Sequence, residues 1–229
     1  PLVREDVLAA HYLFDDPDGT TAANQVTGGP AGTLANGLVF DDSGKFGRAL
    51  SYPELQFTAR MEIVGALPLD SGWTMSVWFK GLDVDNLQAR RLFRGSQESH
   101  ALLNSGTNNL GAFIISKGGF VDSGADLAAA NFVDWHHVAV VGSGGSTIFY
   151  VDGTEVGTVD GQCQDPLRYI GNYSNNRFAQ LLDDLRVYSA ALTAEEVTVL
   201  YGSNSGDATR LPRLPSGLNL TVEKGESLD

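Results

Sequence analysis

Two adjacent carboxylates, Asp183 and Asp184, stand inside an apolar stretch with the pattern of a β-strand. Because side chains alternate along a strand, Asp183 is expected on the same face as Leu181 and Leu185. Asp184 shares the opposite face with Arg186, which can neutralise its charge. A carboxylate carried into an apolar layer must be paired, hydrogen-bonded or bound to a metal. Asp183 is therefore a candidate metal ligand.

A second group of carboxylates follows the first predicted strand, which covers residues 8–14. Asp15, Asp16 and Asp18 lie in a turn that contains a proline and ends in a glycine. Calcium takes about six to eight oxygen ligands, and loops supply them readily. The loop lacks the closing glutamate of an EF-hand. The residues alone leave two interpretations open, a calcium-binding loop and a solvated acidic turn.

Motifs of common enzymes are absent from the sequence. The closely spaced strand carboxylates of a retaining glycosidase do not occur, nor do the serine elbow, the zinc-protease helix or the phosphate loop. His136 and His137 are neighbours on a predicted strand, so they point to opposite faces and cannot easily share one ion. Cys163 is expected to be a small buried hydrophobe. These observations predict a protein that is not an enzyme.

The clearest strand covers residues 73–80, and it carries the candidate ligand-binding residue Trp78. Trp73 and Phe79 fall on its apolar face, whereas Trp78 falls on the other face beside Ser76 and Lys80. A flat aromatic ring between polar neighbours could stack on a sugar. The alternative is a structural tryptophan that a neighbouring segment covers.

Short strands separated by turns fill most of the chain, as is typical of a β-sandwich. Asp152-Gly153 predicts a hairpin, because a type I′ turn requires positive φ at both central residues. Thr193 and Glu196 form a capping box that predicts one short helix. Residues 20–46 are expected to form a long irregular connection. We expect one domain over residues 1–202, and the Pro-rich, polar residues 203–229 are expected to form a linker or the start of a following module.

Charge and hydropathy exclude several classes of function. The 229 residues include 28 acidic and 15 basic side chains, a net charge of −13, which disfavours nucleic-acid binding. No apolar run approaches the ~18–20 residues of a membrane-spanning helix, so membrane insertion is not expected. The given sequence starts without an apolar leader, so we expect either that a signal peptide has been removed or that the sequence is a piece of a longer protein, and localisation must come from analogy.

Several motifs, taken in order, resemble those of laminin-G-like domains in the concanavalin A-like lectin family. They are His11-Tyr-Leu-Phe-Asp15, Gly44-Lys-Phe-Gly-Arg-Ala-Leu50, Trp73-Thr-Met-Ser-Val-Trp78, Trp135-His-His-Val138, Phe149-Tyr-Val-Asp-Gly153, Ile170-Gly-Asn172 and Asp183-Asp-Leu-Arg-Val-Tyr188. The resemblance extends over residues 9–201. It implies an all-β fold, a two-sheet antiparallel jelly-roll sandwich with one short C-terminal helix.

The resemblance also implies a calcium site between the two ends of the domain. In the resembled fold the strand that ends at Asp15 lies close to the strand that carries Asp183, so both carboxylates could bind one Ca²⁺. Asn24 matches a position where the family has an acidic or amide residue, and it is expected to contribute. Asp16 and Asp18 are the alternatives if the loop folds differently.

From the resemblance we expect a noncatalytic, calcium-stabilised binding module of a larger protein. Its location would be extracellular or at the cell surface, and its ligand would be a carbohydrate or an extracellular protein. One alternative is a structural spacer in a surface or adhesin-like protein. Another is a polysaccharide-processing enzyme whose site is not apparent in the sequence.

Overall fold

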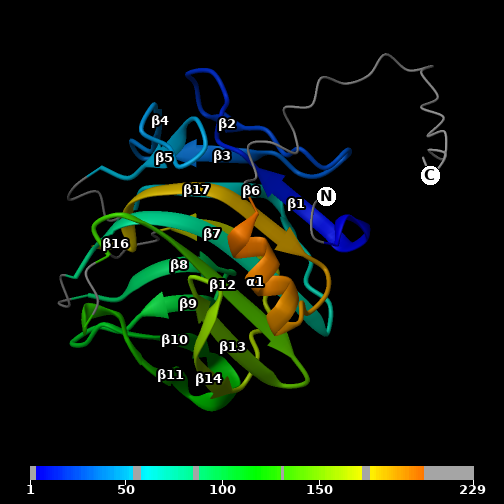
Figure 1. The fold of residues 1–229 in the computed structure, drawn as a ribbon, viewed down its shortest axis with the longest axis vertical. Coiled ribbons are helices and arrows are strands. Elements are labelled where there is room, and N and C mark those ends of the chain that lie inside the picture. Colours follow the sequence, from blue (N-terminus) through cyan, green and yellow to red (C-terminus); the bar gives the residue numbers. More distant parts are fainter. Residues whose placement is uncertain (1–3, 54–57, 85–87, 130–131, 172–175, 204–229) are drawn as a thin grey trace, which may run out of the picture.

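The computed structural model describes residues 4–53, 58–84, 88–129, 132–171 and 176–203 and shows two β-sheets packed face to face (Figure 1). The first sheet has eight strands: β1 (Leu8–Tyr12), β4 (Val39–Asp41), β5 (Ala49–Ser51), β7 (Gly72–Leu82), β12 (Trp135–Ser143), β13 (Ser146–Val151), β14 (Thr154–Asp160) and β17 (Ala179–Tyr188). The second has nine: β2 (Thr21–Ala22), β3 (Gly32–Ala35), β6 (Arg60–Leu67), β8 (Arg90–Arg94), β9 (Ser99–Leu103), β10 (Asn109–Ile114), β11 (Gly119–Asp126), β15 (Leu167–Gly171) and β16 (Asn176–Arg177). In the described residues, one short 3₁₀-helix, Glu5–Val7, precedes β1, and two others, Ile115–Lys117 and Leu127–Ala129, follow β10 and β11. The predicted jelly-roll-like sandwich is confirmed.

The space between the sheets is filled by the alternate residues of each strand. In β7, Trp73, Met75, Val77 and Phe79 all lie in the main hydrophobic core, as the period of two predicts. Cys163 is also buried in this core, which confirms its prediction. The core supports β7. Along its length β7 pairs with β12, which carries His136 and His137, and with β17, which carries Asp183 and Asp184.

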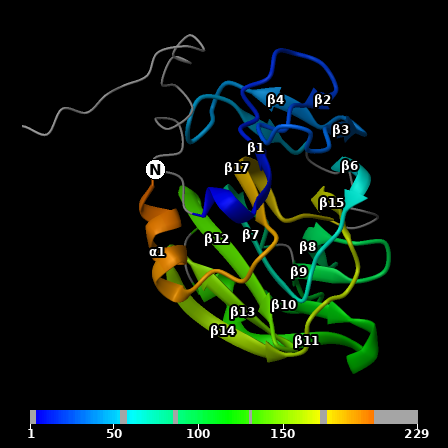
Figure 2. The ribbon, with the colours of Figure 1, turned by 90° about the vertical axis from the view of Figure 1, so that its right-hand side faces the viewer.

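The predicted helix is α1 (Ala194–Gly202), which lies on the outer side of the first sheet, away from the second (Figure 2). The hydroxyl of Thr193 accepts a hydrogen bond from the Glu196 N–H, and the Glu196 carboxylate accepts one from the Thr193 N–H. This capping box satisfies two N–H groups that a helix start leaves unpaired. Val197 and Leu200 are buried, so α1 covers part of the outer face of the sheet.

The hairpin between β13 and β14 has the predicted geometry, because Asp152 and Gly153 both have positive φ, at 50° and 75°. The expectation of an irregular connection over residues 20–46 was wrong. That segment contains β2, β3 and β4, which are only two to four residues long and therefore too short to show a period. Residues 204–229 lie outside the described part of the chain, so the predicted boundary at residue 202 stays a prediction.

Strand β17 contains a β-bulge that changes the predicted face of its residues. Its pairing with β7 shifts register between Asp183 and Arg186, and Asp184 has a left-handed φ of 49°. The extra residue interrupts the alternation, so Leu182, and not Leu181, lies in the core together with Leu185. The bulge buries both carboxylates of the pair and directs them to different partners.

Candidate functional site

Asp183 is buried, as predicted, with 0% of its surface exposed. Its Oδ2 accepts a hydrogen bond from the Phe46 N–H at 2.9 Å, and its Oδ1 accepts one from the Asp184 N–H at 2.7 Å. Burial nevertheless raises the pKa of the Asp183 carboxyl to about 8, because desolvation, together with the charge of Asp184, disfavours the charged form more than the backbone N–H groups favour it. The ionised carboxylate therefore lacks the stabilisation that a nearby positive charge would supply.

Asp15 approaches the same loop from the other end of the chain. Its Oδ1 accepts a hydrogen bond from the Arg48 N–H at 2.8 Å. The preceding residue, Phe14, is fully buried at a left-handed φ of 59°, a conformation that costs a bulky residue about 1–3 kcal/mol. The loop itself is closed by a hydrogen bond from the Gly44 N–H to the Gly47 carbonyl. Asp15 and Asp183 thus bind N–H groups two residues apart on one short loop.

The side chain of Arg48 organises the acidic turn that contains Asp16 and Asp18. It donates to the Asp16 carbonyl at 2.6 Å and to the carboxylates of Asp18 and Asp42, both at 2.8 Å. The Asp16 carboxylate accepts a hydrogen bond from the Ala23 N–H. Asp16 and Asp18, the two alternative calcium ligands, therefore form contacts within the turn in this structure.

Asn24 links β1 to the following turn through hydrogen bonds. Its Oδ1 accepts hydrogen bonds from the N–H groups of His11 and Val26, both at 3.0 Å, and its Nδ2 donates to the Pro30 carbonyl. An amide oxygen has two lone pairs, and both are engaged here. The geometry gives Asn24 a structural role, and we leave it out of the calcium site proposed below.

The donor set around Asp183 fits calcium in its chemistry. Within the described ranges, no three side chains of His, Cys, Asp or Glu form a metal-binding group. A calcium ion at this loop would therefore be held by the carboxylates of Asp15 and Asp183 and otherwise by backbone carbonyls and water, all of which are ligands that calcium accepts. The ion would supply the positive charge that buried Asp183 lacks.

We expect Gly47→Ala to remove most of the effect of calcium on thermal stability. Gly47 has a φ of +96°, and a Cβ there would collide with the Oδ1 of Asp15. Gly28→Ala is a matched control, because Gly28 has a φ of +77° and nothing within 4 Å of its Cβ position. Both variants carry the left-handed backbone cost of roughly 1–2 kcal/mol. Calorimetry with calcium and with chelator measures the shift in melting midpoint. An equal shift in both variants would show that Asp15 is not a calcium ligand.

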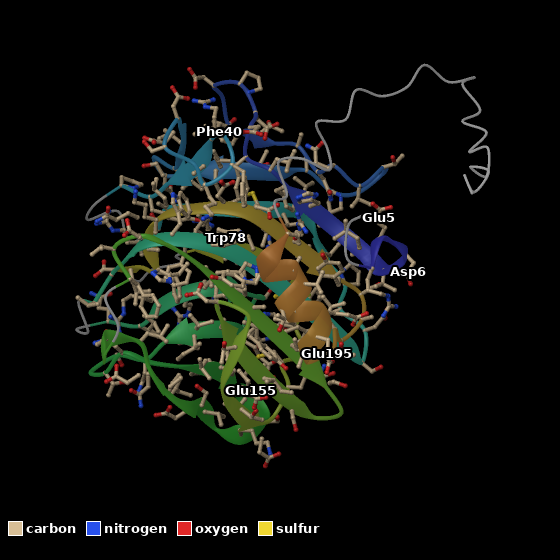
Figure 3. All side chains as sticks on the ribbon, viewed as in Figure 1. Glu5, Asp6, Phe40, Trp78, Glu155 and Glu195 are labelled. Atoms are coloured by element: carbon tan, nitrogen blue, oxygen red, sulfur yellow. The ribbon has the colours of Figure 1, made fainter. Side chains whose placement is uncertain are left out.

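Trp78 is covered, although it lies on the outer face of β7 as predicted. It is 5% exposed and lies beside α1 (Figure 3), where Tyr201 stacks on it with ring centroids 5.5 Å apart. Phe46 and the ammonium of Lys45, 4.4 Å from the ring centroid, cover it further. A sugar could stack on Trp78 only if Tyr201 or Lys45 moved, so the geometry matches the structural interpretation.

Asp184, which has the left-handed φ in the bulge, belongs to a buried polar network with His11 and Arg186. Its Oδ1 lies 2.7 Å from the His11 Nε2 and accepts a hydrogen bond from the Arg186 Nε at 3.3 Å. Arg186 is 1% exposed. The predicted pairing of Asp184 with Arg186 is confirmed. His136 binds Asp152, whereas burial lowers the pKa of neighbouring His137 to about 4, so the two histidines do not form one site.

Several arginines gather on the outer face of the second sheet, a grouping that was not predicted from the sequence. The guanidinium carbons of Arg60, Arg94 and Arg168 lie 5.2, 5.7 and 5.2 Å from the centroid of the Tyr169 ring. These residues come from β6, β8 and β15, which are adjacent in the sheet but distant in sequence. The available signal was the alternation of charged residues with core residues in β6, which places Arg60 outside.

Comparisons with known proteins agree with the fold. Residues 58–198 match the family described as the concanavalin A-like lectin/glucanases superfamily. No curated protein matches the chain. Among solved structures, domain 4 of AbnA, a GH43 extracellular arabinanase from Geobacillus stearothermophilus in complex with arabinotriose, is similar with a TM-score of 0.62 and 21% identity, over 85% of this chain and 98% of that one.

Two longer proteins contain a similar domain. The binding domain of botulinum neurotoxin serotype D has a TM-score of 0.62 and 13% identity, over 86% of this chain and 52% of its own. Trypanosoma rangeli sialidase in complex with sialic acid has a TM-score of 0.62 and 11% identity, over 87% of this chain and 33% of its own. The present chain thus spans about half of the toxin domain and a third of the sialidase. At these identities the likeness concerns the fold alone.

Proposed function

Because the chain belongs to the concanavalin A-like lectin/glucanase superfamily, we propose that it is a noncatalytic, calcium-stabilised, extracellular carbohydrate-binding module. The observation that carries the proposal is the likeness to domain 4 of the arabinanase, a domain of almost the same extent that was solved with arabinotriose. The ligand of our chain need not be the same saccharide, because one fold serves many ligands.

The calcium part of the proposal rests on Asp15 and Asp183. Both carboxylates bind the loop between Gly44 and Arg48, and Asp183 is buried without a cationic partner among the contacts described. A metal there would join the first and last strands of the domain, since Asp15 follows β1 and Asp183 lies in β17. Calcium is thus proposed to stabilise the fold and not to take part in a reaction.

An extracellular location is supported by the extracellular arabinanase to which the chain is similar. No helix in the described part of the chain is long and apolar enough to span a membrane. We propose that the domain acts within a larger protein, as the similar domains of the toxin and the sialidase do.

A glycan array with the purified chain tests this function. We expect binding to at least one class of oligosaccharide and no release of reducing ends when the same polysaccharides are incubated with the protein. Absence of binding to any glycan would favour the structural spacer instead. Release of sugars would favour the polysaccharide-processing enzyme.

A further inference from the structure

Four polar side chains on the outer face of the first sheet, the face on which α1 lies (Figure 2), are almost completely buried. They are Ser76, His137, Arg186 and Tyr188, each 2% exposed or less, and we call them the buried polar cluster. Within the described ranges, five of their polar atoms have no hydrogen-bond partner: the Ser76 Oγ, the His137 Nδ1, both terminal nitrogens of Arg186 and the Tyr188 hydroxyl. Buried polar atoms are nearly always hydrogen-bonded, so five of them in one place indicate a bound species.

The pairing of three strands brings these side chains together. Ser76 of β7 lies opposite Arg186 of β17 on one side and opposite Ala139 of β12 on the other. Tyr188 and His137 each lie two residues further along those neighbouring strands, so both are diagonal to Ser76. Side chains that are directly opposite have Cβ atoms about 4.5–5.5 Å apart, and diagonal ones about 7–8 Å, which a long side chain spans. The cluster therefore surrounds the small side chains of Ser76 and Ala139.

Electrostatic effects confirm that Arg186 lies near both of the diagonal residues. Burial lowers the pKa of His137 to about 4, and the charge of Arg186 adds to the decrease. Burial raises the pKa of Tyr188, and Arg186 opposes the rise through its charge and through a contact with the hydroxyl that falls short of a hydrogen bond. At neutral pH the cluster therefore contains a guanidinium cation beside an uncharged imidazole and an uncharged phenol.

The cluster offers mostly hydrogen-bond donors. The side chain of Arg186 has no acceptor atom, and only its Nε has a described partner, the Asp184 Oδ1 at 3.3 Å. The same Asp184 oxygen lies 2.7 Å from the His11 Nε2, so it already serves two nitrogens. The terminal nitrogens of Arg186 carry N–H groups that need an acceptor, and the hydroxyls of Ser76 and Tyr188 can each donate one hydrogen more.

The helix above the cluster does not meet this need. The side chains that α1 buries, Val197 and Leu200, are apolar and pack with Tyr188. The carboxylate of Glu196 binds the start of the helix with one oxygen and Arg4 with the other. The bound species must therefore be an acceptor that is small enough to lie between the sheet and the helix.

We propose that the buried polar cluster binds one small inorganic anion, of the size of chloride. An anion accepts hydrogen bonds from Arg186, Ser76 and Tyr188 without donating any, whereas each buried water must also place its own two hydrogens on acceptors. The bound anion would join β7, β12 and β17 beneath α1 and so stabilise the docking of the helix. This inference is independent of the proposed binding of carbohydrate and calcium.

Differential scanning calorimetry tests the site with sodium chloride as the probe. Sodium gluconate replaces the chloride at constant ionic strength, because its anion is too large for an enclosed site, and a chelator keeps calcium out of the measurement. We expect the melting midpoint to rise with chloride and to follow the curve of a single site, as an ion that binds only the native state requires. A midpoint that does not depend on chloride, or that follows no binding curve, overturns the proposal.

Two variants that each remove one tyrosine hydroxyl locate the site. Tyr188→Phe keeps the shape of the ring but removes a donor, so it should weaken chloride binding ~10-fold or more. Tyr150→Phe is the matched control, because Tyr150 is also buried in the apolar cluster beneath α1, but its hydroxyl lies within the influence of Glu155 and Glu195. It should change chloride binding less than about twofold. Equal effects in the two variants overturn the proposal.

Crystals of the parent protein grown in sodium bromide provide a test that needs no variant. We expect an anomalous diffraction peak within hydrogen-bond distance of the terminal nitrogens of Arg186 and the hydroxyl of Tyr188. Water without an anomalous peak at this position overturns the proposal. A bromide peak without a calorimetric response to chloride or bromide would show an adventitious ion only, and it would overturn the proposal as well.

Discussion

Calcium is expected to raise the melting midpoint of this protein by several degrees, and Asp183→Asn to remove that effect. An ion that binds only the native state stabilises it by RT ln(1 + [L]/Kd), about 2.7 kcal/mol at ~100 times Kd. For a domain of this size this corresponds to a shift of roughly 5–10 °C. Differential scanning calorimetry with calcium and with chelator measures it.

The pH dependence of the same experiment gives a second check. In the chelated protein Asp183 has a folded pKa of about 8, above the unfolded value of about 4, so the native state holds the proton more tightly. Its contribution to stability is then present at low pH and is lost as the pH rises from about 4 to 8. Calcium binds the deprotonated carboxylate, so the calcium-induced rise in Tm should be small at pH ~5 and largest near pH 8.

Asp160→Asn is the control for this prediction, because Asp160 is exposed and pairs with Lys117 on a different part of the surface. It should respond to calcium like the parent. A response that persists in Asp183→Asn, or that is equally large at every pH between 5 and 8, would exclude Asp183 as a ligand.

Asp184→Asn should destabilise the protein by about 3–5 kcal/mol, because it leaves the charge of buried Arg186 without its carboxylate. Asparagine retains the shape of aspartate and tolerates the left-handed φ at this position, so the loss reports the charge. Urea unfolding followed by circular dichroism measures the free energy of unfolding.

Asp152→Asn provides a closely matched comparison. Asp152 also has a left-handed φ, of 50°, and its carboxylate lies 2.6 Å from the His136 Nδ1, but both side chains are about 30% exposed. A partly exposed pair is screened by water, so the substitution should cost less than about 1 kcal/mol. Equal losses at the two positions would mean that burial does not determine the importance of the Asp184 network.

The sequence predicted those features that depend on neighbours along the chain. The hairpin at Asp152 and Gly153, the capping box at Thr193 and the apolar face of β7 each follow from a local pattern, and the structure confirms all three. The family resemblance added the closeness of the strand that ends at Asp15 to the strand that carries Asp183, and in the structure β1 pairs with β17.

Other features could not be predicted, because they depend on contacts between distant segments. The bulge in β17 arises where that strand pairs with β7, and the sequence of β17 alone reads as regular alternation. The hydrogen bonds from Arg48 to Asp16 and Asp18 in the acidic turn join residues 30 or more positions apart. The cover that Tyr201 places over Trp78 likewise depends on where α1 docks, not on the strand that carries Trp78.

The pairing of the first strand with the last affects how the domain can form during its synthesis. Tyr12 in β1 pairs with Leu185 in β17, a separation of 173 residues (185 − 12). Ribosomes add about 5–20 residues per second, so β1 emerges roughly ten seconds or more before its partner exists. During that interval a strand edge and its apolar side chains stay open to aggregation, and chaperones are expected to matter most for nascent chains that lack β17.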